Sequence, residues 1–247
     1  MATTTSIEWT EQTWNPTTGC DKVSPGCTNC YAERIAKRLK AMGVSGYETG
    51  FDLSLMQDRL EQPLKKKKPT MYFVNSMSDL FHEKIPFDFI DKVFSVIENT
   101  KRHTYQILTK RSKTMREYFS TRMVPGNVWL GVSVENKKHG LPRIDDLRHI
   151  DARIRFISCE PLLEGLGIID LTYIHWVIVG GESGPKARIM RTEWVEPVKN
   201  QCKLQGVAFF FKQWGMWGSD GVRRNTKANG RVLAGRMWNN YPATICC

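Results

Sequence analysis

The chain has 247 residues, of which 41% are hydrophobic and 11% aromatic, so it can bury a sizeable core as one large domain or two small ones. Its formal net charge of +11 favours polyanionic partners, nucleic acid first. The absence of an apolar run of about eighteen residues argues against a membrane span. Residues 1–6 lack the charged and apolar regions of a signal peptide, and we expect a cytoplasmic protein with no membrane partner.

The first informative stretch is segment 19–31, which holds three of the seven cysteines. Cys20, Cys27 and Cys30 have the spacing C-x6-C-x2-C, and clustered thiolates are soft ligands that bind zinc or an iron–sulfur cluster. The sequence offers no fourth Cys or His nearby to complete a structural zinc site, whereas three thiolates can hold a [4Fe–4S] cluster and leave its fourth iron open. The other cysteines suit a reducing compartment, and we expect Cys246 and Cys247 to be exposed thiols.

A helix is predicted over Ala32–Met42, because apolar residues recur on one face and basic residues on the other. Gly43 and Gly46 are expected to end it. Residues 44–69 look irregular and finish with the lysine run Lys65–Lys68. These lysines either contact a phosphate backbone or form a solvated loop.

From residue 70 onward, short apolar runs rich in strand-forming residues alternate with amphipathic helices. The predicted strands are Met71–Val74, Thr104–Leu108, Val128–Val134, Ile154–Ser158, Trp176–Val179 and Val207–Phe211. The predicted helices are Asp88–Asn99, Lys113–Phe119, a weak one near Arg143–Leu147, and Glu193–Leu204. With a first strand inside Glu8–Thr18, this alternation predicts an α/β fold of βαβ units around a parallel sheet of about seven strands. Periodicity alone leaves a curved, partly open barrel and a flat, doubly wound sheet both open.

Further motifs accompany the cysteines along nearly the whole chain. They are Ile7–Thr10, Thr13–Pro16, Phe73–His82, Trp129–Glu135, Phe156–Leu162, Val177–Gly184 and Phe209–Gly215. With them, the chain resembles the radical S-adenosylmethionine (SAM) superfamily and, within it, a phage-type family of gene-product-like proteins with a C-x6-C-x2-C motif. It departs from the usual C-x3-C-x2-C motif of that superfamily in its longer first gap. It also departs at Asn29, which stands where an aromatic residue usually precedes the third cysteine.

The resemblance implies a partial (βα) barrel of the radical SAM type with about six or seven parallel strands, spanning residues 1–215, with the cluster loop at 19–31. Residues 216–247 would then form a C-terminal extension or lid. It also implies that the three cysteines hold a [4Fe–4S] cluster, which takes an electron from a donor such as flavodoxin or ferredoxin. The cluster would cleave SAM to methionine and a 5′-deoxyadenosyl radical, which abstracts hydrogen from a substrate.

Polar residues follow each predicted strand, and the carboxyl ends of parallel barrel strands carry the active site. SAM calls for hydroxyl or carboxylate neighbours at its amine, a cation at its carboxylate, a bidentate acceptor at its ribose and close backbone approach at its adenine. The candidates for the amine are Ser76, Ser78 and Asp79, and for the carboxylate Lys110 or Arg111. The candidates for the ribose are Ser133 with Glu135, and for the adenine Gly180 with Gly181. Tyr31, Asn75 and Glu182 complete the predicted cofactor-binding set. The plain alternatives are a helix cap for Asp79, a solvated acid for Glu135 and a tight turn for the two glycines.

Three further residues are the catalytic candidates. Cys159 could donate a hydrogen atom to a substrate radical, although a lone cysteine in a strand is more often inert core. Glu160 comes next to Cys159 at the same strand end, Lys212 follows the last apolar run, and both are expected to face the same mouth. Trp214, Trp217 and Trp238 either stack bases or fasten the tail to the barrel.

We therefore interpret the chain as a radical SAM enzyme that acts on a nucleic acid or nucleotide, in base modification or lesion repair. A base inside a duplex would have to be flipped out to reach such a site, and a peptide substrate is the other reading. The alternative from a different class is a zinc-bound nucleic acid binding protein without catalysis.

Overall fold

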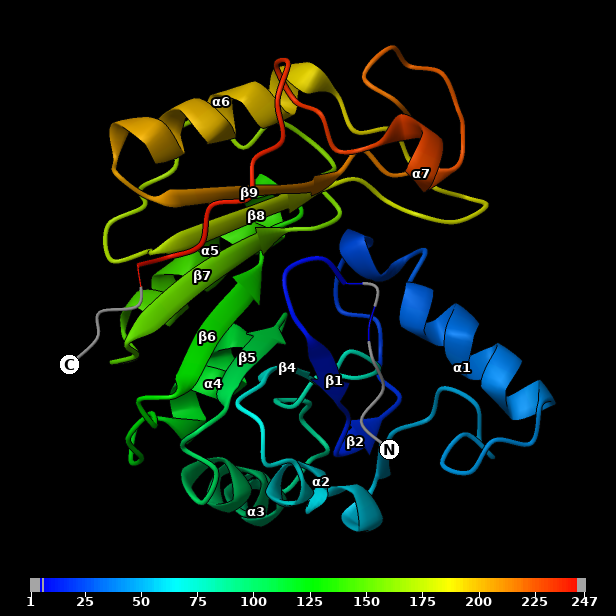
Figure 1. The fold of residues 1–247 in the computed structure, drawn as a ribbon, viewed down its shortest axis with the longest axis vertical. Coiled ribbons are helices and arrows are strands. Elements are labelled where there is room, and N and C mark those ends of the chain that lie inside the picture. Colours follow the sequence, from blue (N-terminus) through cyan, green and yellow to red (C-terminus); the bar gives the residue numbers. More distant parts are fainter. Residues whose placement is uncertain (1–4, 6, 244–247) are drawn as a thin grey trace. The chain divides into compact units, whose positions relative to one another are not determined.

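The computed structural model in Figure 1 describes residue 5 and residues 7–243, so Cys246 and Cys247 lie outside the described residues. The chain divides into two compact units. Unit 1 comprises Met1–Val23, Cys30–Gly131 and His149–Arg153, and unit 2 comprises Ser24–Asn29, Val132–Arg148 and Ile154–Cys247. These units do not test the division expected at residue 215, which stays a prediction.

Unit 1 contains three parallel strands and the helices that connect them. Its strands are β1 (Gln12–Trp14), β4 (Met71–Val74) and β5 (Thr104–Thr109), with a small antiparallel pair, β2 (Thr17–Thr18) and β3 (Ser54–Leu55). Its helices are α1 (Tyr31–Ala41), α2 (Gln62–Lys65), α3 (Phe87–Glu98) and α4 (Ser112–Tyr118), with a 3-10 turn at Gln57–Arg59. In register, Trp14 lies beside Val74, and Val74 lies beside Ile107. The carboxyl ends of β1 and β4 are therefore level with each other, and β5 runs two residues further.

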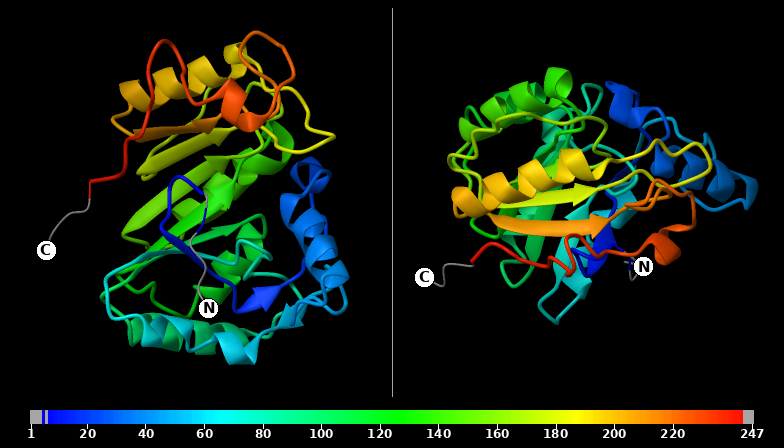
Figure 2. Two further views of the ribbon diagram at one scale, coloured as in Figure 1. Left: turned by 45° about the vertical axis from the view of Figure 1, so that its right-hand side comes forward. Right: turned by 90° about the horizontal axis from the view of Figure 1, so that it is seen from above.

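Unit 2 contains the later strands of the sheet. They are β7 (Ile154–Cys159), β8 (Trp176–Gly180) and β9 (Ala208–Gln213), and the neighbours pair in parallel. Strand β6 (Val128–Ser133) begins in unit 1 and ends in unit 2. The helices are α5 (Lys137–Arg148), α6 (Thr192–Leu204) and α7 (Thr226–Asn229), with a 3-10 turn at Pro25–Cys27. Every residue of β8 is buried, as expected for a parallel strand covered on both faces, and α6 lies along β9 (Figure 2).

The order of the strands decides between the two sheets that periodicity left open. They are hydrogen-bonded in the order β1–β4–β5–β6–β7–β8–β9, which follows the chain without reversal. A doubly wound sheet reverses its order at a switch point, whereas the strands of a (βα) barrel follow one another in sequence. Strands β1 and β9 each have a single neighbour in this sheet, so the barrel is left open. The predicted α/β partial barrel of the radical SAM type is thus confirmed.

The C-terminal tail lies along strand β9 and covers its edge. The Phe211 N–H donates to the Trp238 carbonyl at 2.9 Å, and the Asn240 N–H donates to the Phe209 carbonyl at 3.3 Å. The indole N–H of Trp214 donates to the Val232 carbonyl at 2.8 Å. A free edge strand would offer unpaired backbone groups to other chains, so we assign this tail and its tryptophans a fastening role.

One helix is longer than its sequence predicts. Gly140 and Pro142 weaken the pattern, yet α5 runs from Lys137 to Arg148. The Asn136 side chain accepts a hydrogen bond from the His139 N–H at 2.9 Å, which is the N-cap arrangement that starts a helix. Gly140 is required because a Cβ there would lie 2.7 Å from the Val134 Cα. Among the described residues, none of the helices combines the length and the apolar character needed to cross a membrane.

Candidate functional site

The cluster loop carries three free thiols. Cys20, Cys27 and Cys30 are half-buried, and none of them is in a disulfide. Pro25 begins the 3-10 turn that contains Cys27, and Cys30 is the N-cap of α1. Gly19, which precedes the first ligand, has φ +80°, and a Cβ there would lie 2.1 Å from the Asp52 carbonyl oxygen. Only glycine fits this position, so the loop is held tightly at its start.

In unit 1, Cys20 lies against a buried arginine. The Nη1 of Arg111 is 3.3 Å from the Cys20 Sγ, and its Nη2 donates to the Asp21 carbonyl at 3.2 Å. The Arg111 side chain is 3% exposed and also bonds Glu83 through Nε at 2.7 Å. Burial alone would lower the pKa of this guanidinium, but Asp79 and Cys20 outweigh it and raise the pKa. The arginine therefore stays charged beside the first predicted ligand.

Asp79 connects the end of β4 to the end of β5. Its Oδ1 accepts from the Thr109 hydroxyl at 2.6 Å and from the Phe81 N–H at 3.1 Å. Its Oδ2 accepts from the Lys110 N–H at 3.0 Å and from Arg111 at 3.3 Å. Both oxygens of this buried carboxylate are thus engaged within unit 1, which gives Asp79 a structural role beside its predicted role at the SAM amine.

The other predicted residues of β4 also lie in one network. Asn75 adopts φ 59°, and its Nδ2 donates to the Thr17 hydroxyl at 2.9 Å. Ser78 bonds the same Thr17 hydroxyl at 2.6 Å. The Tyr31 hydroxyl donates to the Ser76 carbonyl at 2.6 Å, so the first residue of α1 is tied to the loop after β4. Unit 1 thus brings together the predicted residues that follow Cys30, β4 and β5.

In unit 2, Glu182 binds the other half of the cluster loop. Its Oε2 accepts from the Asn29 side chain at 3.0 Å, and its Oε1 accepts from Arg188 at 2.6 Å. The same guanidinium donates to the Pro25 carbonyl at 3.0 Å. Burial alone would raise the pKa of Glu182, but the hydrogen bonds from Arg188 and Asn29 hold it below its ordinary value. The ionised carboxylate therefore bonds the segment after Cys27 through Asn29, and it holds Arg188, which bonds the segment before Cys27.

Ser133 ends β6, Glu135 lies two residues beyond it, and both contact α5. The Glu135 carboxylate is fully buried and pairs with Arg143 at 2.6 Å. Arg143 also donates to the Ser133 carbonyl at 2.8 Å. A Cβ on Gly26 would lie 3.2 Å from the Glu135 side chain, so this loop residue packs directly against the buried ion pair. Glu135 thus lies beside Gly26 of the cluster loop, and Ser133 shares its arginine partner; the predicted ribose contact stays a prediction.

The ends of β7, β8 and β9 form a second polar group. Lys212 pairs with the Glu160 Oε1 at 3.1 Å, and the Ser158 hydroxyl donates to its Oε2 at 3.0 Å. A Cβ on Gly180 would lie 2.5 Å from the Glu160 Oε1, so the glycine makes room for this carboxylate. Cys159 is fully buried in β7, and burial raises the pKa of its thiol. Glu160 and Lys212 are therefore brought together, while Cys159 faces the core.

Gly181 has a different neighbour. A Cβ there would lie 1.9 Å from the Trp214 carbonyl oxygen, and its N–H donates to the Gln213 carbonyl at 2.9 Å. The close approach that this glycine permits is thus made by the chain itself at the end of β9. The predicted adenine contact at Gly180 and Gly181 stays a prediction.

Sequence reasoning missed two arginines of the site. Arg188 lies in a loop with no periodic pattern, and Arg143 lies in the helix weakened by Pro142. Their partners, Glu182 and Glu135, were found because they follow apolar runs. One signal was present, since a strand-end carboxylate that becomes buried needs a cation, but the sequence does not say which cation.

The residues present fit a [4Fe–4S] cluster. Its known ligands are cysteine thiolates, and the loop offers three free, half-buried ones. Arg111 beside Cys20 favours the thiolate form through its charge. Within residues 5 and 7–243, no three His, Cys, Asp or Glu side chains gather as the ligands of a single ion. A cluster held by three cysteines would bind each thiolate through a different iron.

Exchanging Glu182 for glutamine is expected to loosen the loop around Cys27. The change removes charge-assisted hydrogen bonds worth about 1.5–3 kcal/mol. The N–H groups of Cys27 and Thr28, which bond the Ser24 and Pro25 carbonyls, should then exchange with deuterium roughly ten-fold faster or more. Hydrogen exchange followed by mass spectrometry measures this, with the exposed Glu193→Gln change on α6 as control. Equal hydrogen-exchange rates of these N–H groups in both variants would show that Glu182 does not support the loop.

Solved structures of spore photoproduct lyase share this fold. A mutant with dinucleoside spore photoproduct is 13% identical, with a TM-score of 0.50 over 81% of this chain and 63% of that chain. Another complex with the dinucleoside is 12% identical, with a TM-score of 0.47 over the same shares. A mutant with bound AdoMet is 14% identical, with a TM-score of 0.45 over 73% of this chain and 58% of that chain. The chain thus spans less than two thirds of the lyase it matches, and the likeness shows the fold.

Two comparisons of sequence complete the picture. No curated protein matches the chain, and the phage-type assignment stays a prediction. The model of the family described as "Protein of unknown function (DUF5131)" matches residues 4–242. Because this match covers nearly the whole sequence, the chain belongs to the DUF5131 family.

Proposed function

We propose that the chain is a radical SAM enzyme whose [4Fe–4S] cluster is held by Cys20, Cys27 and Cys30. The observation that carries this proposal is the triad itself: three free, half-buried thiols on the one loop that follows β1 and β2 in a chain with an open parallel barrel. Such a cluster supplies the reductive cleavage of SAM and, through it, the abstraction of hydrogen from a substrate. A donor such as flavodoxin or ferredoxin would supply the electron.

The chain's own residues would hold the loop and orient the cofactor. Arg111 bonds Cys20 and the Asp21 carbonyl, while Glu182 and Arg188 bond Asn29 and Pro25. The bonds of Arg111 lie within unit 1 and those of Glu182 and Arg188 within unit 2, and each set holds the part of the loop in its own unit. Enzymes gain most from groups that are preorganised in this way.

The SAM molecule would lie against the strand ends that the sequence predicts. Ser76, Ser78 and Asp79 follow β4, and Lys110 follows β5. Ser76, Ser78 and Asp79 remain the proposed contacts of the SAM amine, with Asp79 held in place by Thr109 and Arg111, and Lys110 remains the proposed contact of the carboxylate. Ser133 with Glu135, and Gly180 with Gly181, remain the proposed ribose and adenine contacts.

Reductive cleavage of SAM tests the proposed chemistry. We expect the anaerobically reconstituted protein, reduced by dithionite, to form 5′-deoxyadenosine and methionine, which chromatography with mass spectrometry would detect. The Cys27→Ala variant is the matched control, since it keeps the chain but loses one ligand. No 5′-deoxyadenosine above this control, from protein that holds a full cluster, would contradict the proposal.

We further propose a nucleic acid or nucleotide substrate, in base modification or lesion repair. The support is the net charge of +11 together with a lysine run that has a fixed backbone. Arg102 donates to the Leu64 carbonyl at 3.1 Å and to the Lys66 carbonyl at 2.9 Å. His103 lies 3.0 Å from the same Lys66 carbonyl. Lys65, Lys67 and Lys68 are exposed. Their charged groups therefore lie in solvent, on a segment whose backbone is fixed by these hydrogen bonds.

Binding of short DNA and RNA should therefore depend on salt. Each phosphate neutralised contributes a slope of about −0.7 to −0.9 in log affinity against log salt concentration. Changing Lys65–Lys68 to glutamine should lower the affinity and flatten this slope, as measured by fluorescence anisotropy over a salt series. The same change at Lys199 and Lys203 of α6 is the control. A flat series, or equal slopes, would point to a small-molecule or peptide substrate instead.

A further inference from the structure

The Arg111 side chain makes several contacts around Cys20 in unit 1. It lies two residues beyond the end of β5, and its side chain is buried. One guanidinium nitrogen is 3.3 Å from both the Cys20 Sγ and the Asp79 Oδ2. The second donates to the Asp21 carbonyl, and Nε donates to Glu83. Because all three nitrogens are engaged, this side chain is better placed to act on the sulfur than on a ligand's carboxylate.

The charges around this arginine differ in their exposure. Asp79 is almost as buried as Arg111, with 8% of its side chain exposed, whereas Glu83 is 57% exposed. His82 is buried beside Glu83 and Asp21, and burial lowers its pKa. Near neutral pH, the cation closest to the Cys20 sulfur is therefore the guanidinium. The carboxylates of the buried Asp79 and the exposed Glu83 both offset the positive charge of this guanidinium.

We propose that Arg111 is a positioning residue for the cluster, which orients Cys20 and raises the cluster's reduction potential. This inference rests on the proposed function. Reduction adds negative charge, and both a nearby cation and an N–H bonded to a ligand sulfur stabilise that charge. The carboxylate beside Arg111 should act on the cluster in the opposite sense. We therefore expect Glu83 to lower the cluster's reduction potential and Arg111 to raise it.

The two partners of this ion pair give a test with opposite signs. Glu83→Gln removes an anion that lies 2.7 Å from Nε, so the midpoint potential should shift upward. Arg111→Met removes the cation and the bond to sulfur, so the potential should shift downward. Arg111→Lys, which keeps the charge but loses the planar fork, should lie between wild type and Arg111→Met. A purely structural role would loosen Cys20 in every variant and predicts no upward shift.

The measurement is a redox titration of the anaerobic holoprotein followed by electron paramagnetic resonance. It is made at about pH 8, where His82 is neutral. Asp91→Asn, which removes a carboxylate that pairs with Arg122 elsewhere in unit 1, is the control and should leave the potential unchanged. If Arg111→Met fails to fold because Asp79 is left unpaired, the exposed Glu83→Gln variant decides the question.

The outcomes separate this inference from the proposed function. An upward shift in Glu83→Gln, with no shift in Asp91→Asn, supports the role of Arg111. A full cluster whose potential is unmoved in Glu83→Gln overturns the inference and leaves the proposed function standing. A wild-type protein that binds no iron overturns both.

Discussion

Single replacement of Cys20, Cys27 or Cys30 by alanine abolishes assembly of the cluster in our account. A three-thiolate site has no spare ligand, so each variant should fall from about four irons per chain to nearly none. Because the three cysteines of this loop are only half-buried, the fold should survive each substitution. Anaerobic reconstitution, followed by iron and sulfide analysis and by circular dichroism, measures both effects.

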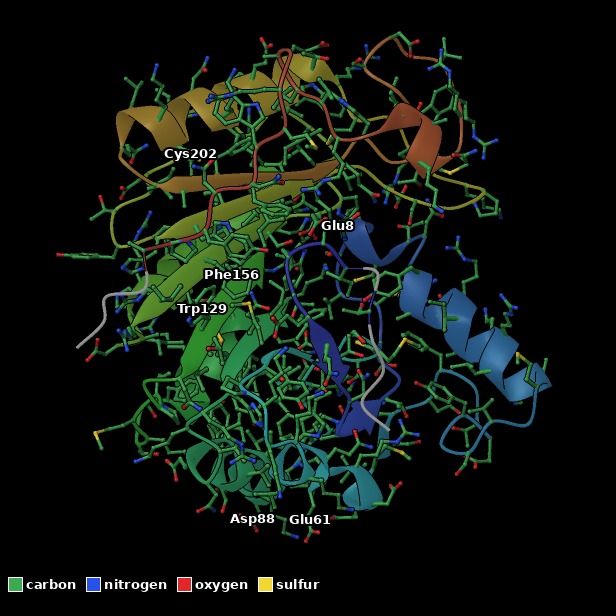
Figure 3. The ribbon with its side chains drawn as sticks, viewed as in Figure 1. Glu8, Glu61, Asp88, Trp129, Phe156 and Cys202 are labelled. Carbon is green, nitrogen blue, oxygen red and sulfur yellow. The ribbon has the colours of Figure 1, made fainter. Side chains whose placement is uncertain are left out.

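Cys202 provides the matched control for this series. It lies in α6 (Figure 3), where it is fully buried and burial raises the pKa of its thiol to about 12. Cys202→Ala should cost about 1 kcal/mol or less through a small cavity and should keep the whole cluster. A Cys27→Ala protein that still assembled a full cluster would show that the triad is assigned incorrectly.

The second large effect is on stability, in the Arg143→Met variant. It leaves the Glu135 carboxylate, which is fully buried, without the guanidinium 2.6 Å away. Removing one partner of a buried ion pair typically costs about 3–5 kcal/mol. The reduction in the free energy of unfolding can be measured by urea denaturation of the apoprotein.

Two further variants decide how this loss is read. Replacing both partners, as Glu135→Leu with Arg143→Met, should recover much of the stability, because no buried charge is then left unpaired. Arg224→Met, which removes an exposed partner of Asp220, should have a much smaller effect. A loss in Arg143→Met no greater than that in Arg224→Met would refute the importance of this pair.

The regular elements were predictable because their signals are local. The alternation of apolar runs and amphipathic helices predicted strands at Met71–Val74 and Trp176–Val179, which are observed as β4 and as most of β8. Helix α2 and the small pair β2–β3 were missed, since elements of two to four residues have no measurable period. The family resemblance implied an open barrel, but periodicity could not predict it, because the strand order depends on contacts between distant segments.

The candidate site also combines features that have a local sequence signal with features that depend on distant residues. The cysteine triad is a local spacing, so sequence alone selected it. The clamp on the loop depends on Asn29 and Glu182, which are 153 positions apart, and the contact of Arg111 with Cys20 spans 91 positions. No periodicity or spacing rule pairs residues at such separations. Sequence therefore identified strand-end acids such as Glu182 without their cations, and it assigned Arg111 to a ligand rather than to a sulfur.

Metal analysis of anaerobically purified protein tests the central claim most directly. We predict about four irons per chain with a matching amount of acid-labile sulfide, and an absorption spectrum that dithionite bleaches. About one zinc per chain with no iron would contradict the claim, and it would favour a zinc-bound nucleic acid binding protein without catalysis.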